Sequence, residues 1–422
     1  MAGFFKIAVR EKLPFVFLAV IFVILTQKAM QGLVVESKTL SPLWQYDFIL
    51  FYQHYLLKFL VPLDLTVFYP YSETAAVRHL LIGGMVLVGI TLVTIVLRRQ
   101  KSFLLIGWLW FLFTLLPVAG LVHDGPHRVA DRYAYIPIAG LIIALCWLVS
   151  SAIRSRRSVQ AAFLLGCTVV AVLSFLSFQQ TARWKDSESL FRHAAALYPG
   201  NHLARNNLGD ALESKGRIEE AMAQYFLAIK IQPGFARAHY NLGNIFAEQG
   251  REEDALFHYT RAVENFPLFF EALHNAGVLL ARSGRLFMAE DHLQRAIQLR
   301  PDSEEAKRNM DHLQKSLEPI KHGIKVLQNR LALSPHDAMS LNELGLLYRR
   351  GGDIDAARYC FQQAIENDPA FAGAYNNLGI LYAEQQNYSA AEQQFRKALE
   401  IDPLFPGVKE NIMYVEQLGA GK

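Results

Sequence analysis

Proline recurs every 34 residues in the second half of this chain. The seven positions keep one register: Pro199, Pro233, Pro267, Pro301, Pro335, Pro369 and Pro403. A repeat of this length is typical of two antiparallel helices that cannot bury their apolar faces alone and therefore stack on their neighbours. The pattern predicts that about half of the chain forms an α-solenoid, an array of stacked helix pairs.

Two further features recur in this register. Asn-Leu-Gly or a close variant stands in the first helix of five units, at residues 207–209, 241–243, 275–277, 343–345 and 377–379. Glycine occupies the turn between the two helices at Gly216, Gly250, Gly284 and Gly352, where a left-handed residue is needed. The pattern resembles the tetratricopeptide repeat (TPR) family over residues 185–420. The resemblance implies a half-repeat at 181–199, six TPR units over 200–403, and a capping helix with a tail at 404–422.

The unit at 302–335 departs from the pattern. Asp311 and Glu318 replace its two glycines, and only the spacing and Pro335 keep it in register. We therefore expect a degenerate unit here, in the form of a distorted helical pair.

Asparagine forms a ladder at one position of the first helices, the helices expected to line the concave face. Its members are Asn207, Asn241, Asn275, Asn309, Asn377 and Asn411, with Glu343 as the single interruption. An amide can both donate to and accept from a peptide backbone, so the ladder is a candidate site for an extended peptide or protein segment. The alternative is that these amides bond to the adjacent repeat.

The first 180 residues are predicted to form a membrane domain. The chain is 52% hydrophobic, and five apolar runs approach the roughly 20 residues that cross a bilayer. These predicted spans are 13–30, 79–97, 103–122, 135–153 and 159–178. The stretch 44–61 carries Asp47, His54 and Lys58 at helical spacing, so we expect an interfacial helix there. The predicted fold is thus all-α, with polytopic membrane helices followed by a TPR solenoid.

Basic residues predict the orientation of these spans. Clusters stand before the first span, between the second and third, and between the fourth and fifth. All three lie on one side if 44–61 does not cross, and the positive-inside rule makes that side cytoplasmic. We therefore expect an integral protein of a bacterial inner membrane with an extracytoplasmic TPR array. The clusters account for the net charge of +4, so no nucleic-acid partner is predicted.

The segment 123–137 gathers charged side chains at a predicted extracytoplasmic membrane boundary. Arginine suits bidentate contact with phosphate, so Arg128, Asp131, Arg132 and Tyr133 are candidates for binding a lipid phosphate. Alternatively, Asp131 and Arg132 form a local ion pair and the tyrosines are interfacial anchors. His123 and His127 are four residues apart, but Gly125-Pro126 between them disfavours a helix, so no metal site is predicted.

Two segments carry a second resemblance. Asp131–Pro137 reads Asp-Arg-Tyr-Ala-Tyr-Ile-Pro, and Phe59–Pro70 precedes the later spans. Together with the TPR units they resemble the later portion of the transmembrane and TPR-containing proteins, polytopic glycosyltransferases of the GT-C type. Some members of that family transfer mannose from a dolichyl-phosphate donor to protein hydroxyls. The resemblance implies a polyprenyl-phosphate sugar donor and a protein acceptor; no other cofactor is expected.

The acidic catalytic motif of GT-C enzymes is not recognisable in this sequence. GT-C enzymes carry acidic catalytic residues in the first extracytoplasmic loop, whereas this chain offers Glu36, Asp47, Asp64 and Glu73 there without a paired motif. No catalytic residue is assigned, and we expect a truncated chain, a partner of an upstream membrane subunit, or a pseudo-enzyme.

Three functions remain open from the sequence. The first is a membrane-anchored TPR scaffold for proteins or peptides. The second is one part of a GT-C glycosyltransferase that acts on proteins. The third is a subunit of polysaccharide or pilus assembly.

Overall fold

The computed structural model describes residues 47–67, 69, 77–116 and 130–420, and every regular element within these ranges is a helix. The chain divides into two compact units, Met1–Ala238 and His239–Lys422, which are treated separately below. The predicted span 13–30, like Arg128, lies outside the described residues.

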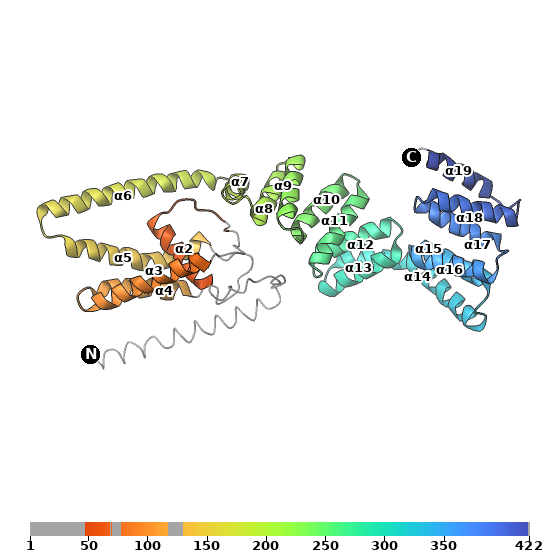
Figure 1. Cartoon of the computed structure of the whole chain (residues 1–422), viewed down its shortest axis with the longest axis horizontal. Coiled ribbons are helices and arrows are strands. Elements are labelled where there is room, and N and C mark those ends of the chain that lie inside the picture. The colour runs from red at the N-terminus through yellow and green to blue at the C-terminus, as the bar shows by residue number, and fades with distance from the viewer. Residues whose placement is uncertain (1–46, 68, 70–76, 117–129, 421–422) are drawn as a thin grey trace. The chain divides into compact units, whose positions relative to one another are not determined.

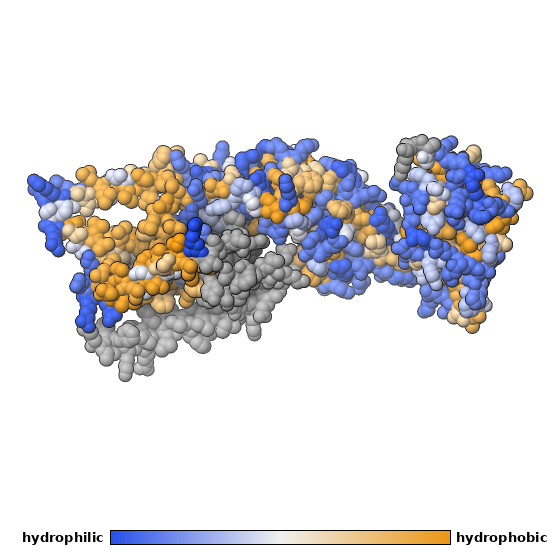
Figure 2. Space-filling model, in the orientation of Figure 1, coloured by the Kyte–Doolittle hydropathy of each residue, from blue (hydrophilic) through white to orange (hydrophobic). Residues whose placement is uncertain are grey.

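The first unit begins with a group of apolar helices (Figure 1). They are α2 (Asp47–Leu60), α3 (Val77–Val96), η2 (Leu97–Arg99), α4 (Ser102–Leu115), η4 (Asp131–Ala134), α5 (Tyr135–Ala152) and α6 (Arg156–Arg183). Within the described ranges, three stretches are long and apolar enough to cross a membrane: Arg78–Arg99, Asp131–Ala152 and Arg156–Arg183. Their positions match the predicted spans 79–97, 135–153 and 159–178. The predicted span 103–122 is described only to residue 116, and its helix α4 is shorter. Hydrophobic residues cover these helices in Figure 2.

Helices α4 and α5 pack against each other in opposite directions. Phe103 near the start of α4 lies 6.3 Å from Trp147 near the end of α5, measured between ring centroids. At the other end, Trp110 Nε1 donates to the Ile136 carbonyl oxygen at 2.9 Å. The start of α4 is therefore level with the end of α5.

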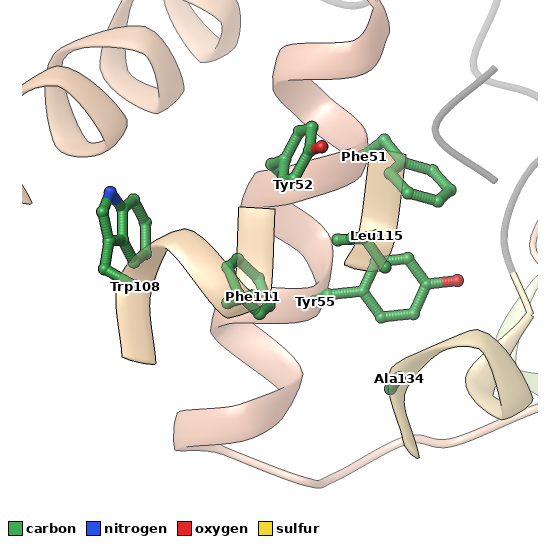
Figure 3. Close-up of a cluster of buried hydrophobic side chains, with 7 residues drawn as sticks. All are labelled: Phe51, Tyr52, Tyr55, Trp108, Phe111, Leu115 and Ala134. Atoms are coloured by element: carbon green, nitrogen blue, oxygen red, sulfur yellow. The ribbon is translucent and has the colours of Figure 1, made fainter. Parts of the chain in front are cut away.

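Helix α2 contributes an aromatic face to the core of this helix group. Figure 3 shows the cluster of buried side chains from α2, α4 and η4: Phe51, Tyr52, Tyr55, Trp108, Phe111, Leu115 and Ala134. Tyr52 Oη donates to the Leu112 carbonyl oxygen at 2.7 Å, which ties α2 to α4. With 14 residues, α2 is roughly 21 Å long, shorter than the roughly 30 Å of bilayer hydrocarbon. Helix α2, which the sequence predicted to lie at the membrane interface, thus packs one side against α4 and η4.

The helix pairs of the array follow. The first unit holds α7 (Ser187–Leu197), α8 (His202–Glu213) and α9 (Ile218–Ile231), and the unit boundary falls within α10 (Ala236–Glu248). The second unit continues with α11 (Glu252–Asn265), α12 (Phe270–Arg282), α13 (Leu286–Leu299), α14 (Glu304–Leu333), α15 (Ala338–Gly351), α16 (Ile354–Asn367), α17 (Ala372–Glu384), α18 (Tyr388–Ile401) and α19 (Val408–Ala420).

Glycine in the first helix of a pair makes room for a ring from the second. A Cβ added at Gly379 would lie 2.6 Å from the ring of Phe395, and one at Gly345 would lie 2.6 Å from Phe361. The turn glycines have the positive φ that the sequence predicted, for example 73° at Gly250 and 82° at Gly352. These two glycine positions therefore set the pair geometry.

The degenerate unit at 302–335 differs from the expected distorted pair. It forms one continuous helix of 30 residues, α14, with Pro319 inside it. The physical reason is the missing turn glycine: Glu318 cannot cheaply adopt the left-handed conformation that ends a helix, so the helix continues. Its buried face changes partner along its length, with Met310 and Leu313 packed beside Leu293, and Ile320 and Leu327 beside Leu344.

Candidate functional site

The segment that follows α2 meets the start of η4 through a buried tyrosine. Tyr69 Oη donates a hydrogen bond to Asp131 Oδ1 at 2.7 Å, and the Tyr69 side chain is 9% exposed. The backbone N–H of Thr66 points to the Tyr69 hydroxyl at 3.4 Å. Burial raises the pKa of Tyr69, so the phenol keeps its proton and acts as the donor to the carboxylate.

Two side chains of α2 fix the same region. Tyr55 is fully buried; its Oη donates to the Ala130 carbonyl oxygen at 2.7 Å and accepts from the Ala130 N–H at 3.0 Å. Lys58 Nζ donates to the carbonyl oxygens of Leu63 and Asp64 and lies 5.8 Å from the centre of the Tyr69 ring. The chain is thereby folded back after α2 so that Tyr69 reaches Asp131.

The same segment also contacts the end of α6 and the first helix of the array. Gln180 Nε2 donates to the Leu65 carbonyl oxygen at 3.1 Å. The rings of Tyr69 and Tyr198 meet edge to face, with centroids 6.0 Å apart. Residues 61–67 and 69 thus connect the helix group to the start of the array within the first unit. We call these residues the strap.

Two of the predicted lipid-phosphate residues, Asp131 and Arg132, have different surroundings. Asp131 faces Tyr69, whereas Arg132 is exposed and its guanidinium lies 5.1 Å from the centre of the Tyr133 ring. Among the described residues, Arg132 makes no ion pair with Asp131, so the alternative of a local salt bridge does not describe this segment. A carboxylate repels a phosphate, which leaves Arg132 as the described side chain suited to contact one. Arg128, His123 and His127 lie outside the described residues.

The acidic residues considered for catalysis are placed as follows. Asp64 is exposed with a positive φ of 54°, and Asp47 begins α2. Glu36 and Glu73 lie outside the described residues. Asp131 is the half-buried carboxylate at the η4 end of the helix group. Within the described ranges no three histidine, cysteine or acidic side chains gather as metal ligands.

The asparagine ladder makes regular side-chain hydrogen bonds between neighbouring pairs of the second unit. Each donates through Nδ2 to a side chain 31 or 35 residues earlier: Asn275 to Asn244 at 3.2 Å, Asn309 to His274 at 2.9 Å, Asn377 to Asn342 at 2.9 Å and Asn411 to Asn376 at 3.3 Å. In the first unit Asn207 Oδ1 accepts from Asn206 Nδ2 at 3.3 Å. Asn241, in the second unit, lies half-buried on α10. Four of the six amides thus tie neighbouring repeats together through Nδ2, which is what the alternative expectation described for them.

Sequence reasoning missed the roles of Tyr69 and Tyr55. No periodicity links them to Asp131, because the contact joins residues 62 positions apart. The resemblance of Phe59–Pro70 to the same family as Asp131–Pro137 was the available signal, since two segments of one family in one chain are candidates for contact.

Comparisons with models of protein families agree with the repeat register. Family models described as tetratricopeptide repeats match residues 342–404, 209–250 and 236–267. The chain carries tetratricopeptide repeats. A solved TPR structure, YrrB, "a TPR protein with an unusual peptide-binding site", is 20% identical with a TM-score of 0.26 and covers 54% of this chain and 97% of that one.

Two similar proteins have names that state an activity. Protein O-mannosyl-transferase Tmtc2 of Drosophila melanogaster is 30% identical over 125 residues, which is 29% of this chain and 13% of that protein. Protein O-mannosyl-transferase TMTC1 of Mus musculus is 29% identical over 136 residues, which is 32% of this chain and 14% of that protein. The similarity is low and partial, and the matched region is a small part of each relative.

Proposed function

We propose that this chain is a membrane-anchored TPR protein whose array binds protein or peptide segments on the extracytoplasmic side of a bacterial inner membrane. The tetratricopeptide repeats carry the binding part of this proposal, because stacked helix pairs present an extended surface to a partner.

The membrane part rests on the apolar helices. The apolar window of α6 has 0% of its residues buried against the rest of the protein, although its mean hydropathy is 2.3. At 28 residues the helix is roughly 42 Å long, enough to cross the hydrocarbon of a bilayer. Exposing such a surface to water is unfavourable, and lipid removes that cost.

The orientation follows from helix direction and charge. Because α4 and α5 are antiparallel, Lys101 before α4 and Arg154 after α5 lie at the same end of the helix group. The positive-inside rule makes this end cytoplasmic. Helix α6 then leads from Arg156 at that end to Arg183, next to the array. This path of the chain supports an array on the opposite, extracytoplasmic side.

Reporter fusions test this arrangement. Alkaline phosphatase, which is active only outside the cytoplasm, is fused after Gln180 and after Gly216, and after Gln100 as the contrasting site. We expect activity at the first two positions and none at Gln100. Inactive enzyme at both Gln180 and Gly216 would overturn the extracytoplasmic array.

A second candidate function is one part of a GT-C glycosyltransferase that uses a polyprenyl-phosphate sugar donor for protein O-glycosylation. It is favoured by the exposed Arg132 beside the Tyr69–Asp131 contact and by the names of the similar proteins. We expect the chain alone to be inactive, because no paired acidic motif is present in the predicted first outside loop. Incubation of the purified chain with polyprenyl-phosphate mannose and a serine-rich peptide tests this; glycosylated peptide would place catalysis in this chain.

A further inference from the structure

We infer that the last three first-helices of the array, α15, α17 and α19, bind a peptide segment in the polyproline II conformation that carries an apolar side chain at every third residue and an acidic side chain at one end. This inference rests on the proposed protein-binding function and names the chemistry of the partner.

Three apolar side chains repeat at one position of these helices. Leu346, Ile380 and Tyr414 are 34 residues apart, one on each helix. Leu346 is 37% exposed and Tyr414 is 61% exposed, whereas Ile380 is half-buried and one side of it packs against the core of α17, α18 and α19. At the same position α10 has Asn244, which accepts a hydrogen bond from Tyr259 Oη at 2.7 Å, α12 has Val278, and α14 has His312. Because His312 interrupts the row after Val278, the continuous apolar row is limited to α15, α17 and α19.

The row lies beside the amide ladder. Asn377 donates to Asn342 and Asn411 donates to Asn376, so α15, α17 and α19 are direct neighbours along this face. Residues three or four apart share a helix face, which places Ile380 next to Asn376 and Asn377. The amide oxygens of this face can accept hydrogen bonds from a peptide backbone.

Spacing selects the conformation of the bound segment. Neighbouring packed helices lie about 8–10 Å apart. Three residues of a polyproline II helix advance about 9.3 Å and bring the side chain back to the same face. Three residues of a β-strand cover a similar length, but residues i and i+3 then point to opposite faces. A polyproline II segment therefore presents one apolar side chain to each helix of the row.

Charge beside the row distinguishes its two ends. Arg350 follows Leu346 by one helical turn, is exposed, and makes no ion pair within the described part of the chain. Its neighbour Arg349 is already paired with Glu384 at 2.6 Å. On α19 the corresponding position is the apolar Leu418. An acidic side chain at the α15 end of the segment would complement Arg350.

Synthetic peptides and the full chain in detergent test the inference. Three fluorescent peptides of about twelve residues share one composition, with leucine at every third residue, at every second residue, or in one block. Each ends in glutamate, and binding is followed by fluorescence anisotropy. We expect the every-third peptide to bind about tenfold more tightly than the others, because only it places leucines on all three helices.

Two variants localise the binding. Tyr414→Asp should weaken binding of the every-third peptide about tenfold or more, whereas Met288→Asp on α13, at a residue 51% exposed against 61% for Tyr414, should not. Arg350→Glu should weaken binding of the glutamate-ended peptide, and a lysine-ended peptide should restore it. Equal binding of the three peptides, or full binding by Tyr414→Asp, overturns the inference.

A separate measurement tests the proposed protein-binding function independently of the peptide experiments. A photocrosslinking residue is placed in living cells at Tyr414 or, as the comparison, at Asn244. Capture of a protein at Asn244 but not at Tyr414 would support the scaffold function and overturn this inference. Capture at neither position would count against the scaffold function itself.

Discussion

Tyr69 donates a hydrogen bond to Asp131 across 62 residues of sequence, with 2.7 Å between Oη and Oδ1. The contact joins the two segments that resemble one glycosyltransferase family, and it lies where the strap meets the end of α6. Because both side chains are at least half-buried, the hydroxyl replaces water that the carboxylate would otherwise bind.

Replacing this donor should destabilise the first unit. Tyr69→Phe keeps the ring contact with Tyr198 but leaves a half-buried carboxylate without its phenol, at a cost of about 1–3 kcal/mol. Thermal unfolding of the full chain in detergent measures the change. Tyr198→Phe is the matched control, because the contact between Tyr69 and Tyr198 involves the rings. Equal melting temperatures for Tyr69→Phe and the parent chain would show that the bond contributes nothing.

Arg132 offers a test of lipid-phosphate contact. Arg132→Lys keeps the charge but loses the planar fork that binds two phosphate oxygens. We expect weaker binding to nanodiscs that contain polyprenyl phosphate, with the melting temperature unchanged. The control is Arg157→Lys, which makes the same change at the start of α6, at the proposed cytoplasmic end of the helix group. A lower melting temperature with unchanged lipid affinity would assign Arg132 a structural role instead.

The packing of α4 on α5 depends on glycine. A Cβ at Gly107 would lie 2.4 Å from the Gly140 carbonyl oxygen and 2.6 Å from the Ala144 Cβ. Gly107→Ala should therefore force the helices apart at a cost of about 1–3 kcal/mol. Gly166→Ala on α6 meets nothing within 4 Å and should be neutral or slightly stabilising. The melting temperatures of both variants are measured by thermal unfolding. Equal melting temperatures would contradict the close contact between α4 and α5 at Gly107.

The repeat register let the sequence predict most of the array, because helix-pair geometry is set by residues close in sequence. Pro233 and Gly250 mark the ends of helices, and the helices α9, α10 and α11 follow from them. The continuous helix α14 was harder to predict, since it depends on whether Glu318 and Pro319 end a helix or extend one. Because Glu318 stands where other units have the turn glycine, the helix continues, and its buried face packs first beside Leu293 of α13 and then beside Leu344 of α15.

The candidate site was predicted only in part. Asp131 and Arg132 were recognised from local composition, but their different surroundings arise from contacts made by distant residues. Tyr69 is brought to Asp131 by the folding back of the strap, which Lys58 stabilises through backbone carbonyl groups. Such contacts leave no period in the sequence. The ladder was visible from its spacing, whereas the direction in which its amides point required the structure.

The ladder bonds should stabilise the second unit. Asn377→Ala removes the donor to Asn342 Oδ1, which lies 2.9 Å away, and should cost about 0.5–1.5 kcal/mol. Asn329→Ala, at an exposed position of α14, is the control and should change little. Thermal unfolding and affinity for the every-third peptide are measured on the same preparations. Weaker peptide binding by Asn377→Ala at unchanged stability would instead make this amide a ligand contact.

A buried histidine pair should make the second unit sensitive to acid. His239 Nδ1 and His258 Nδ1 lie 3.0 Å apart, and the two residues are 6% and 7% exposed. Burial, then the neighbouring His239, lowers the pKa of His258 to about 4, while Asp254 acts weakly in the opposite direction. An unfolded histidine titrates near 6.5. Below that pH the unfolded chain binds a proton that the folded chain refuses, so stability falls as pH is lowered towards 4.

For one such histidine, we expect the free energy of unfolding to fall by roughly 2 kcal/mol between pH 7 and pH 5. His258→Gln can still accept or donate toward His239 but does not titrate, so its melting temperature should fall less over this range. His312→Gln, at an exposed position of α14, should leave the pH dependence as in the parent chain. Melting temperatures of the three proteins at pH 7, 6 and 5 provide the comparison. Parallel pH curves for His258→Gln and the parent would show that this pair is not the source of the acid sensitivity.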